Sequence, residues 1–344
     1  MKVENPTSRD IADIAGVSQA TVSRALRNSP LVRKETRDRI QAIARELNYF
    51  VNRNAASLRT HQSNTIALLL FDDGSETDTR MNLFLMSLLN NIVRIAAGQG
   101  YDVLVSLQQL SDDWHIQYQA SNRADGLILL GYGDYMQYRE KLTALTDANT
   151  RFMIWGPLIK DFPGHTFGCD NESGGYRATG HLIDIGRRNI AFIGSKSGRS
   201  PEHGARHAGY RRAQRDAGVA CNEHLRFAAD NSERQGYQAT MRLLESGQPC
   251  DAIFAGTDLI AIGAMRALQD AGRRIPEDVS VVGFDDMPLA AYVSPALTTV
   301  RQNSELGAEG LVNGIVGLIK GKPVESSLMA PTLVIRESCG AANR

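Results

Sequence analysis

The chain has 344 residues, enough for about two or three domains of ordinary size. Hydrophobic residues make up 42% of it and charged residues 22%, proportions that exclude a largely disordered or fibrous protein. The 38 basic and 38 acidic side chains cancel, and this zero net charge, taken alone, argues against a nucleic-acid partner.

The charges are distributed unevenly along the chain. Residues 1–61 contain 11 basic and 6 acidic side chains, a net charge of +5. The rest of the chain therefore has 27 basic and 32 acidic side chains, a net charge of −5. A compact basic segment can bind a polyanion by neutralising its phosphates, so the N-terminal segment becomes a candidate for nucleic-acid binding.

The composition gives no sign of a membrane, metal or cofactor site. No apolar run approaches the ~20 residues that span a bilayer, and the N-terminus lacks a signal-peptide core. We therefore expect a cytoplasmic protein without a membrane partner. The four cysteines form no CxxC pair, and His203 and His207 have no carboxylate at metal-ligand spacing. No metal and no cofactor are expected.

Residues 7–27 predict two short helices joined by a tight turn. Thr7 and Asp10 have capping-box spacing, which predicts a helix that starts at Ser8. Gly16 supplies the turn, and Ser18 can cap a second helix from Gln19 to about Arg27. The residues expected in the core are Ile11, Ile14 and Ala15 from the first helix and Val22, Ala25 and Leu26 from the second.

A third helix, about Lys34–Leu47, has apolar residues at helical spacing in Ile40, Ile43 and Leu47. Two short helices around a glycine turn, completed by a third, form a unit typical of DNA recognition. The segment Asp10–Leu26, together with Thr36-Arg37 and Leu47-Asn48-Tyr49, resembles the LacI/GalR family of bacterial transcription regulators. The resemblance implies a helix-turn-helix DNA-binding domain over residues 1–51.

The resemblance also assigns roles within this domain, with the second helix in the major groove of double-stranded DNA. It places base-reading side chains at Gln19, Ala20 and Arg24, and phosphate contacts at Ser18, Thr21, Ser23 and Thr36. An arginine can donate two hydrogen bonds to guanine, a contact worth ~1–3 kcal/mol of discrimination. Phosphate contacts set the register on the duplex without reading its sequence. The alternative for Thr21 and Ser23 is an ordinary solvated helix surface.

Residues 52–61 resemble the family's hinge helix, which pairs with that of a second subunit in the minor groove. The matching residues are Asn52, Arg53, Ala55, Leu58 and Arg59. So short a helix is marginal on its own, which would suit a switch that DNA and the partner subunit stabilise. Two departures stand out: Val51 replaces the usual proline, and Arg33 replaces a small capping residue. The alternative is a passive linker.

From residue 62 onward, short apolar runs alternate with helical patterns. Such runs predict parallel sheets covered by helices on both faces, in an α/β fold with two lobes. The clearest predicted strands are Ile66–Phe71, Asp102–Leu107, Gly126–Leu130, Phe152–Trp155, Ile190–Gly194, Ala252–Ala255 and Val279–Gly283.

This core, residues 62–344, also resembles the LacI/GalR family and, through it, the type I periplasmic-binding-protein fold. The quoted motifs are Ala124–Ile128, Gly186–Gly194, Arg206–Tyr210, Val281–Asp286 and Leu297–Gln302. The resemblance implies three crossings between lobes, near residues 165, 300 and 330. The N-lobe would comprise about 64–165 and 301–330, and the C-lobe about 166–300 and 331–344.

The resemblance places effector-binding side chains at Arg206, Thr257 and Asp285, and the indole of Trp155 adds a fourth candidate. Charged side chains form strong hydrogen bonds to hydroxyl groups, and an indole can stack on a sugar or a planar ring. The alternatives are core packing for Trp155 and an ion pair across the lobes for Arg206 and Asp285. Asp258 is expected to cap a helix that begins at Leu259. Ile154 stands where the family often has an acidic residue, so effector chemistry cannot be copied from a relative.

These features predict a ligand-responsive transcription repressor that binds a palindromic operator as a homodimer. A sugar or sugar derivative is the expected effector, acting as inducer of carbohydrate-utilisation genes. A purine-like corepressor, or a solute-binding protein of the same core fold, is the alternative. The sequence contains no dinucleotide, P-loop or nucleophile-elbow motif, so no enzyme is predicted.

Overall fold

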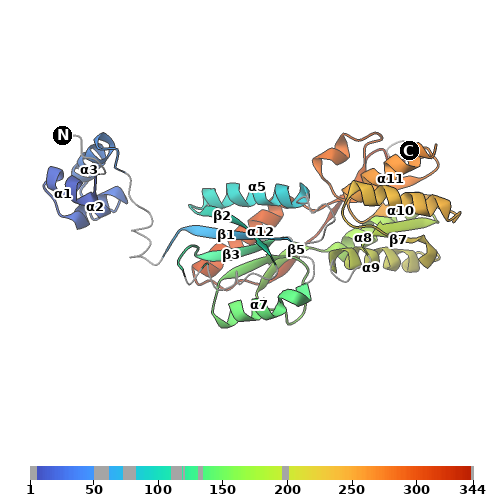
Figure 1. Ribbon diagram of the computed structural model, residues 1–344, viewed down its shortest axis with the longest axis horizontal. Coiled ribbons are helices and arrows are strands. Elements are labelled where there is room, and N and C mark those ends of the chain that lie inside the picture. The colour runs from blue at the N-terminus through green and yellow to red at the C-terminus, as the bar shows by residue number, and fades with distance from the viewer. Residues whose placement is uncertain are drawn as a thin grey trace. The chain divides into compact units, whose positions relative to one another are not determined.

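The computed structural model describes residues 6–49, 62–72, 83–109, 118, 121–130, 135–195 and 201–341. The chain divides into two compact units, Met1–Ser63 and Asn64–Arg344 (Figure 1). Within these described ranges, no helix is long and apolar enough to cross a bilayer.

The part of the first unit that the structure describes contains the helices α1 (Ser8–Ala15), α2 (Gln19–Leu26) and α3 (Lys34–Glu46). The predicted capping box is confirmed, because the Thr7 hydroxyl accepts from the Asp10 backbone N–H and the Asp10 carboxylate accepts from the Thr7 N–H. The Thr7 hydroxyl also donates to the Asp10 carboxylate at 2.7 Å, and this bond, together with the one from the Thr7 N–H, holds the pKa of Asp10 below its ordinary value. Gly16 ends α1 with φ = 61°, a left-handed conformation that glycine adopts without steric cost.

The core of this unit differs from the prediction at one residue. Ile11, Ala12 and Ala15 of α1 are buried, whereas Ile14 is 57% exposed. An α-helix turns by about 100° per residue, so Ile11, Ala12 and Ala15 share one buried face of α1, and Ile14 lies outside this face. The remaining buried members of this core are Val22, Ala25, Val32, Ile40 and Ala44.

The first sheet of the second unit is six-stranded and parallel, and its order is β11-β5-β4-β3-β1-β2. Its strands are β1 (Thr65–Asp72), β2 (Asp102–Gln109), β3 (Gly126–Leu130), β4 (Phe152–Trp155), β5 (His165–Cys169) and β11 (Ser327–Met329). Helices α5 (Leu83–Gly98) and α12 (Ser304–Ile319) cover one face, and α7 (Tyr135–Asp147) covers the other. Strand residues are therefore apolar on both faces, as the continuous apolar runs predicted.

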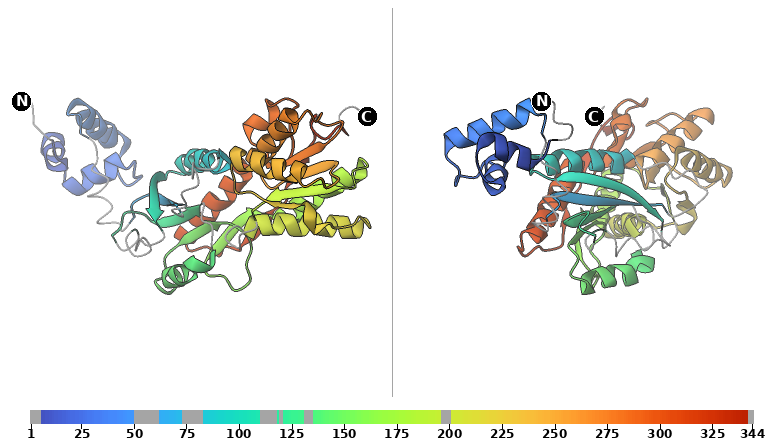
Figure 2. Two further views of the ribbon diagram at one scale, coloured as in Figure 1. Left: turned by 45° about the vertical axis from the view of Figure 1, so that its right-hand side comes forward. Right: turned by 60° about the vertical axis from the view of Figure 1, so that its left-hand side comes forward.

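The second sheet has the order β12-β10-β9-β8-β6-β7, with β12 antiparallel to β10 and the other pairs parallel. Its strands are β6 (Ile190–Gly194), β7 (Arg226–Ala228), β8 (Ala252–Ala255), β9 (Ser280–Asp285), β10 (Thr298–Arg301) and β12 (Thr332–Val334). Helices α8 (Asn171–Asp184) and α9 (Pro201–Asp216) cover one face, and α10 (Glu233–Glu245) and α11 (Asp258–Asp270) the other (Figure 2). The predicted two-lobed α/β fold is confirmed.

The chain passes between the two sheets three times. The first passage follows β5, because residues 165–169 pair with β4 of the first sheet. The crossing expected near residue 165 lies here, a few residues further along the chain, because the short strand containing His165 and Gly168 lacks the apolar pattern used to predict the others. The second passage lies between β10 and α12, and the third between β11 and β12.

The contact between α8 and α9 depends on glycine. A Cβ at Gly175 would lie 2.1 Å from the carbonyl oxygen of Arg206, whereas one at Gly180 of the same helix would meet nothing within 4 Å. We expect Gly175→Ala to lower the free energy of unfolding by about 1–3 kcal/mol, because α9 must move away. Gly180→Ala should instead raise it by up to ~1 kcal/mol through helix propensity. Urea unfolding of both variants checks this, and equal effects would contradict it.

Candidate DNA-binding and effector sites

Helix α2 presents the side chains predicted to read bases. Ser18 is its N-cap and accepts a hydrogen bond from the Thr21 backbone N–H at 3.2 Å. Gln19, Ala20 and Arg24 are exposed, while Ser23 is half-buried. The Gln19 amide donates to the Ser8 hydroxyl at 3.0 Å, so it must leave this contact before it can reach a base.

Three other arginines of this unit differ from Arg24 in their side-chain contacts. Arg39 donates to the Ala15 carbonyl at the end of α1, Arg27 to the Ser23 carbonyl, and Arg45 to the Gln41 carbonyl. The Arg24 side chain makes no hydrogen bond or ion pair with any residue that the structure describes. Its guanidinium is therefore available to an external acceptor.

The remaining predicted DNA contacts divide into two groups. Thr36 lies half-buried in the first turn of α3, where Arg33 is the N-cap and provides no side-chain cap. The predicted hinge residues Asn52, Arg53, Ala55, Leu58 and Arg59 lie outside the described residues.

Replacing Arg24 by alanine tests the base-reading prediction. We expect the variant to lose about 1–3 kcal/mol of discrimination at one base pair of each half-site, because the bidentate donor is removed. Fluorescence anisotropy with a selected palindrome and its single-base changes measures this loss. Arg45→Ala, which removes an exposed arginine bound only to its own helix, should leave base preference unchanged. An unchanged preference in the Arg24 variant would refute the assignment.

Arg206 lies on α9 and is held by four neighbours in the second sheet's lobe. Its side chain is buried, donates to Asn171 Oδ1 at 2.8 Å and to the Gly256 carbonyl at 2.5 Å, and stacks 3.8 Å from the centre of the Phe284 ring. Its guanidinium also lies 3.8 Å from Asp285 Oδ1. These contacts fix the position and orientation of the cation.

Asp285 ends β9 with one oxygen satisfied and one not. Oδ1 accepts from the Gln302 amide at 2.7 Å, whereas Oδ2 is buried without a partner among the described residues. Its backbone φ of 121° is unusual for a residue with a side chain, and such strain is concentrated at functional sites. Burial raises the pKa of Asp285 to about 6, although the Arg206 cation and the Gln302 amide both oppose this rise.

The ion pair does not cross the lobes. Arg206 and Asp285 both belong to the lobe of the second sheet. The alternative prediction of an ion pair is therefore right about the pair but wrong in placing it across the two lobes. The pair instead joins α9 to the carboxyl end of β9.

Thr257, and not the expected Asp258, caps helix α11. Thr257 is the N-cap of α11, accepting from the Ile260 N–H at 3.3 Å and donating to Asn231 Oδ1 at 2.7 Å. The prediction that Asp258 caps this helix is therefore wrong. Asp258 is fully buried and accepts from the Met287 N–H and the Thr299 hydroxyl. Burial and the nearby Asp285 carboxylate raise its pKa well above the ordinary value.

Trp155 occupies the core of the first lobe. It is 8% exposed, its ring centre lies 5.5 Å from that of Phe84, and α12 approaches it through Gly307. Ile154, which replaces an acidic residue, points to the opposite face and joins the other core cluster. The structure thus shows a packing role for Trp155, and its contact with an effector stays a prediction.

Three polar residues of this region were not predicted. Asn171 and Gln302 hold Arg206 and Asp285, and His203 accepts from the Ser195 N–H through Nδ1 at 3.1 Å. Burial and the Arg206 cation lower the pKa of His203 to about 3, so this imidazole is neutral. Gln302 directly follows β10, and Asn171 lies two residues beyond the end of β5. Their position just past a strand could have drawn attention to them.

Two family models match separate parts of this chain, and known proteins match nearly its whole length. The profile of the bacterial regulatory proteins of the lacI family matches residues 7–52, and that of the periplasmic binding protein-like domain matches residues 179–339. The transcriptional repressor PurR of Erwinia tasmaniensis is 31% identical over 342 residues, covering 96% of each chain. The chain belongs to the LacI family of bacterial transcription regulators.

Solved structures of LacI-family proteins share this architecture. The Lac repressor dimer bound to operator and the anti-inducer ONPF superimposes with a TM-score of 0.84 at 26% identity, covering 98% of this chain and 99% of that one. The complex of the regulator CelR with cellobiose gives a TM-score of 0.71 at 29% identity, with 97% and 99% covered. This LacI-family chain is therefore a DNA-binding regulator with a periplasmic-binding-protein-like core.

Proposed function

We propose that this protein is a ligand-responsive repressor, and that a sugar or sugar derivative bound at Arg206 and Asp285 lowers its affinity for a palindromic operator. Gln19, Ala20 and Arg24 would read bases, and Ser18, Thr21, Ser23 and Thr36 would contact phosphates. Among the similar structures, CelR binds the disaccharide cellobiose, which supports a carbohydrate effector.

The unpartnered Oδ2 of Asp285 is the observation that carries this proposal. A buried carboxylate oxygen without a hydrogen bond costs about 1–3 kcal/mol, and a hydroxyl of a bound ligand would remove this cost. The adjacent Arg206 is held in place by Asn171 and Gly256, so it need not reorganise to donate to the same ligand. A neutral polyhydroxylated molecule offers both the donor and the acceptor that this pair requires.

A thermal-shift screen identifies the effector. Monosaccharides, disaccharides, their phosphates and purines are added to the full-length protein, and a true ligand stabilises it by ~2.7 kcal/mol at a hundredfold excess over Kd. Asp285→Asn should abolish the shift caused by that ligand. Asp278→Asn, on a half-buried carboxylate of the same lobe that pairs with Arg274, should leave the shift intact. A ligand shift unaffected by Asp285→Asn would overturn the assignment of the site.

The effect of the ligand on operator binding decides between an inducer and a corepressor. A sugar inducer should lower the affinity of the protein for the operator, whereas a purine-like corepressor should raise it, and fluorescence anisotropy of a labelled operator measures this affinity. Absence of any sequence-specific binding at physiological salt would overturn the repressor itself. The alternative of a solute-binding protein lacks an explanation for the lacI-family segment at residues 7–52.

We also propose that the regulator acts as a homodimer through the outer side of the first lobe. Helix α5 exposes Leu83, Met86 and Val93, and the edge strand β2 exposes Val105 and Leu107, the last at 67%. Such an apolar surface is typical of a protein interface, and the similar Lac repressor structure is a dimer. Leu107→Asp should yield monomers in analytical ultracentrifugation. A tetramer of the unmodified protein, or a dimer unchanged by the substitution, would contradict this interface.

A further inference from the structure

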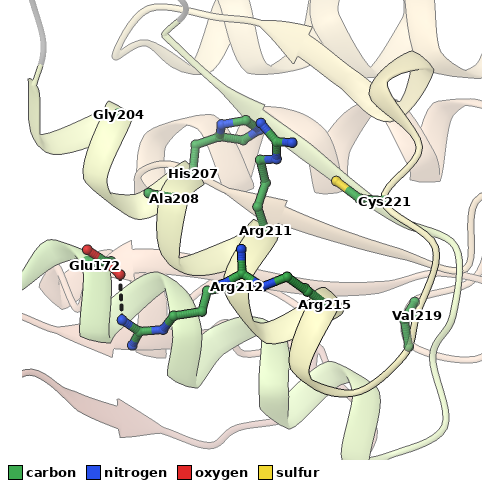
Figure 3. A pocket seen from close by; sticks show the side chains of 9 residues that line it. All are labelled: Glu172, Gly204, His207, Ala208, Arg211, Arg212, Arg215, Val219 and Cys221. Carbon is green, nitrogen blue, oxygen red and sulfur yellow. Dashed lines mark hydrogen bonds and ion pairs between the residues drawn. The ribbon is translucent and has the colours of Figure 1, made fainter.

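Helix α9 has a second functional candidate on the side opposite to Arg206. A pocket of about 690 Å³ opens along its exposed face, within the ~300–1,000 Å³ that small-molecule sites occupy (Figure 3). Its side chains include three guanidinium groups, from Arg211, Arg212 and Arg215. Because the rest of the chain beyond residue 61 has a net charge of −5, this concentration of positive charge is local.

Helical spacing brings these arginines together. Residues 208, 211, 212 and 215 recur at intervals of three and four, so they share one face of α9. Gly204 and Ala208 have small side chains and leave the space beside the arginines open (Figure 3). The opposite face of the helix buries Arg206, so the pocket is separate from the proposed effector site.

Each arginine of the cluster has an acidic neighbour, but only one of the three contacts is close. Glu172 from α8 pairs with Arg212 at 2.5 Å and is the only carboxylate among the described residues that line the pocket. Arg211 and Arg215 form exposed ion pairs with Glu223 and Asp216, each at 3.7 Å, a distance too long for a direct hydrogen bond. Arg211 and Arg215 therefore keep N–H donors for another acceptor, and solvent-exposed ion pairs of this kind are weak enough to be displaced.

We propose that this pocket binds the phosphate group of a small molecule, bridged by Arg211 and Arg215. The oxygens of a phosphate dianion accept the paired N–H groups of a guanidinium, and the dianion can replace the exposed partners Glu223 and Asp216 at Arg211 and Arg215. The volume exceeds that of a single phosphate, so it also accommodates the organic part of a phosphate monoester. The site gives this regulator a second ligand, independent of the molecule bound at Asp285.

Isothermal titration calorimetry of the full-length protein tests the site, with inorganic phosphate and glycerol 3-phosphate as probes and ionic strength fixed with KCl. We expect saturable binding of one ligand per chain. The double variant Arg211→Gln, Arg215→Gln should weaken it at least ~tenfold, because two charge-assisted contacts are lost. Arg266→Gln, an exposed arginine of the same lobe with one ion pair to Glu233, is the matched control and should bind normally.

A gain of affinity distinguishes the site from damage to the fold. Glu172→Gln removes the competing carboxylate and should tighten phosphate binding by several-fold, a result that partial unfolding cannot produce. Tighter binding of glycerol 3-phosphate than of inorganic phosphate assigns the site to an ester, and the reverse assigns it to free phosphate. Absence of saturable binding, an equal loss in Arg266→Gln, or binding of a phosphoserine peptide alone would overturn the proposal.

Discussion

Arg206→Ala is expected to lower the free energy of unfolding by about 3–5 kcal/mol, the range found when one partner of a buried charge pair is removed. The substitution leaves Asp285 buried without its neighbouring cation, and it removes the donor to the Gly256 carbonyl and the cation over Phe284. Urea unfolding at neutral pH, monitored by circular dichroism, measures the loss.

A double-mutant cycle separates the pair from the other contacts of Arg206. Arg206→Ala should lower the free energy of unfolding less in an Asp285→Asn background than in the parent protein, because no uncompensated carboxylate remains. Arg212→Ala, which removes an arginine of the same helix from a partly exposed ion pair, should cost no more than ~1 kcal/mol. Equal losses at Arg206 and Arg212 would show that the buried network is energetically unimportant.

Stability is expected to fall as the pH rises from about 4 to about 6. Asp285 has a pKa of about 6 in the folded protein, above its value in the unfolded chain, so in this range the folded state binds the proton more tightly. The protonated Asp285 carboxyl contributes its full stabilisation below the pKa of the unfolded chain. This contribution is lost as the pH rises past the pKa of the folded protein. The difference between the two pKa values corresponds to a fall in the free energy of unfolding on the order of 3 kcal/mol. Asp258, whose pKa is also raised by burial, adds to this fall as the pH rises.

Unfolding free energies measured at several pH values check this dependence. Asp285→Asn should reduce the slope between pH 4 and 6, because one titrating group is removed. Asp278→Asn provides the opposite case: Arg274 lowers the pKa of Asp278 to about 2, so its contribution is lost only below pH 4. That variant should leave the slope between pH 4 and 6 unchanged. A slope that persists in Asp285→Asn and Asp258→Asn together would contradict the assignment.

Local patterns in the sequence were sufficient for most of the secondary structure. The strands Gly126–Leu130, Phe152–Trp155, Ile190–Gly194 and Ala252–Ala255 have the bounds predicted from their apolar runs. These runs are readable because parallel strands covered on both faces are apolar at every position. Strand β5 was missed, since its glycine, histidine and threonine carry no such pattern and only its neighbours define it.

The helix-turn-helix and the division of charge were determined by the sequence itself, because capping, turn geometry and net charge depend on residues close together in the chain. The tertiary structure decided which charges meet. It placed Arg206 and Asp285 within one lobe, buried Asp258 behind the Thr257 cap, and packed Trp155 under α12. These outcomes depend on contacts between residues tens of positions apart, where burial and charge pairing, which no local pattern encodes, decide the arrangement.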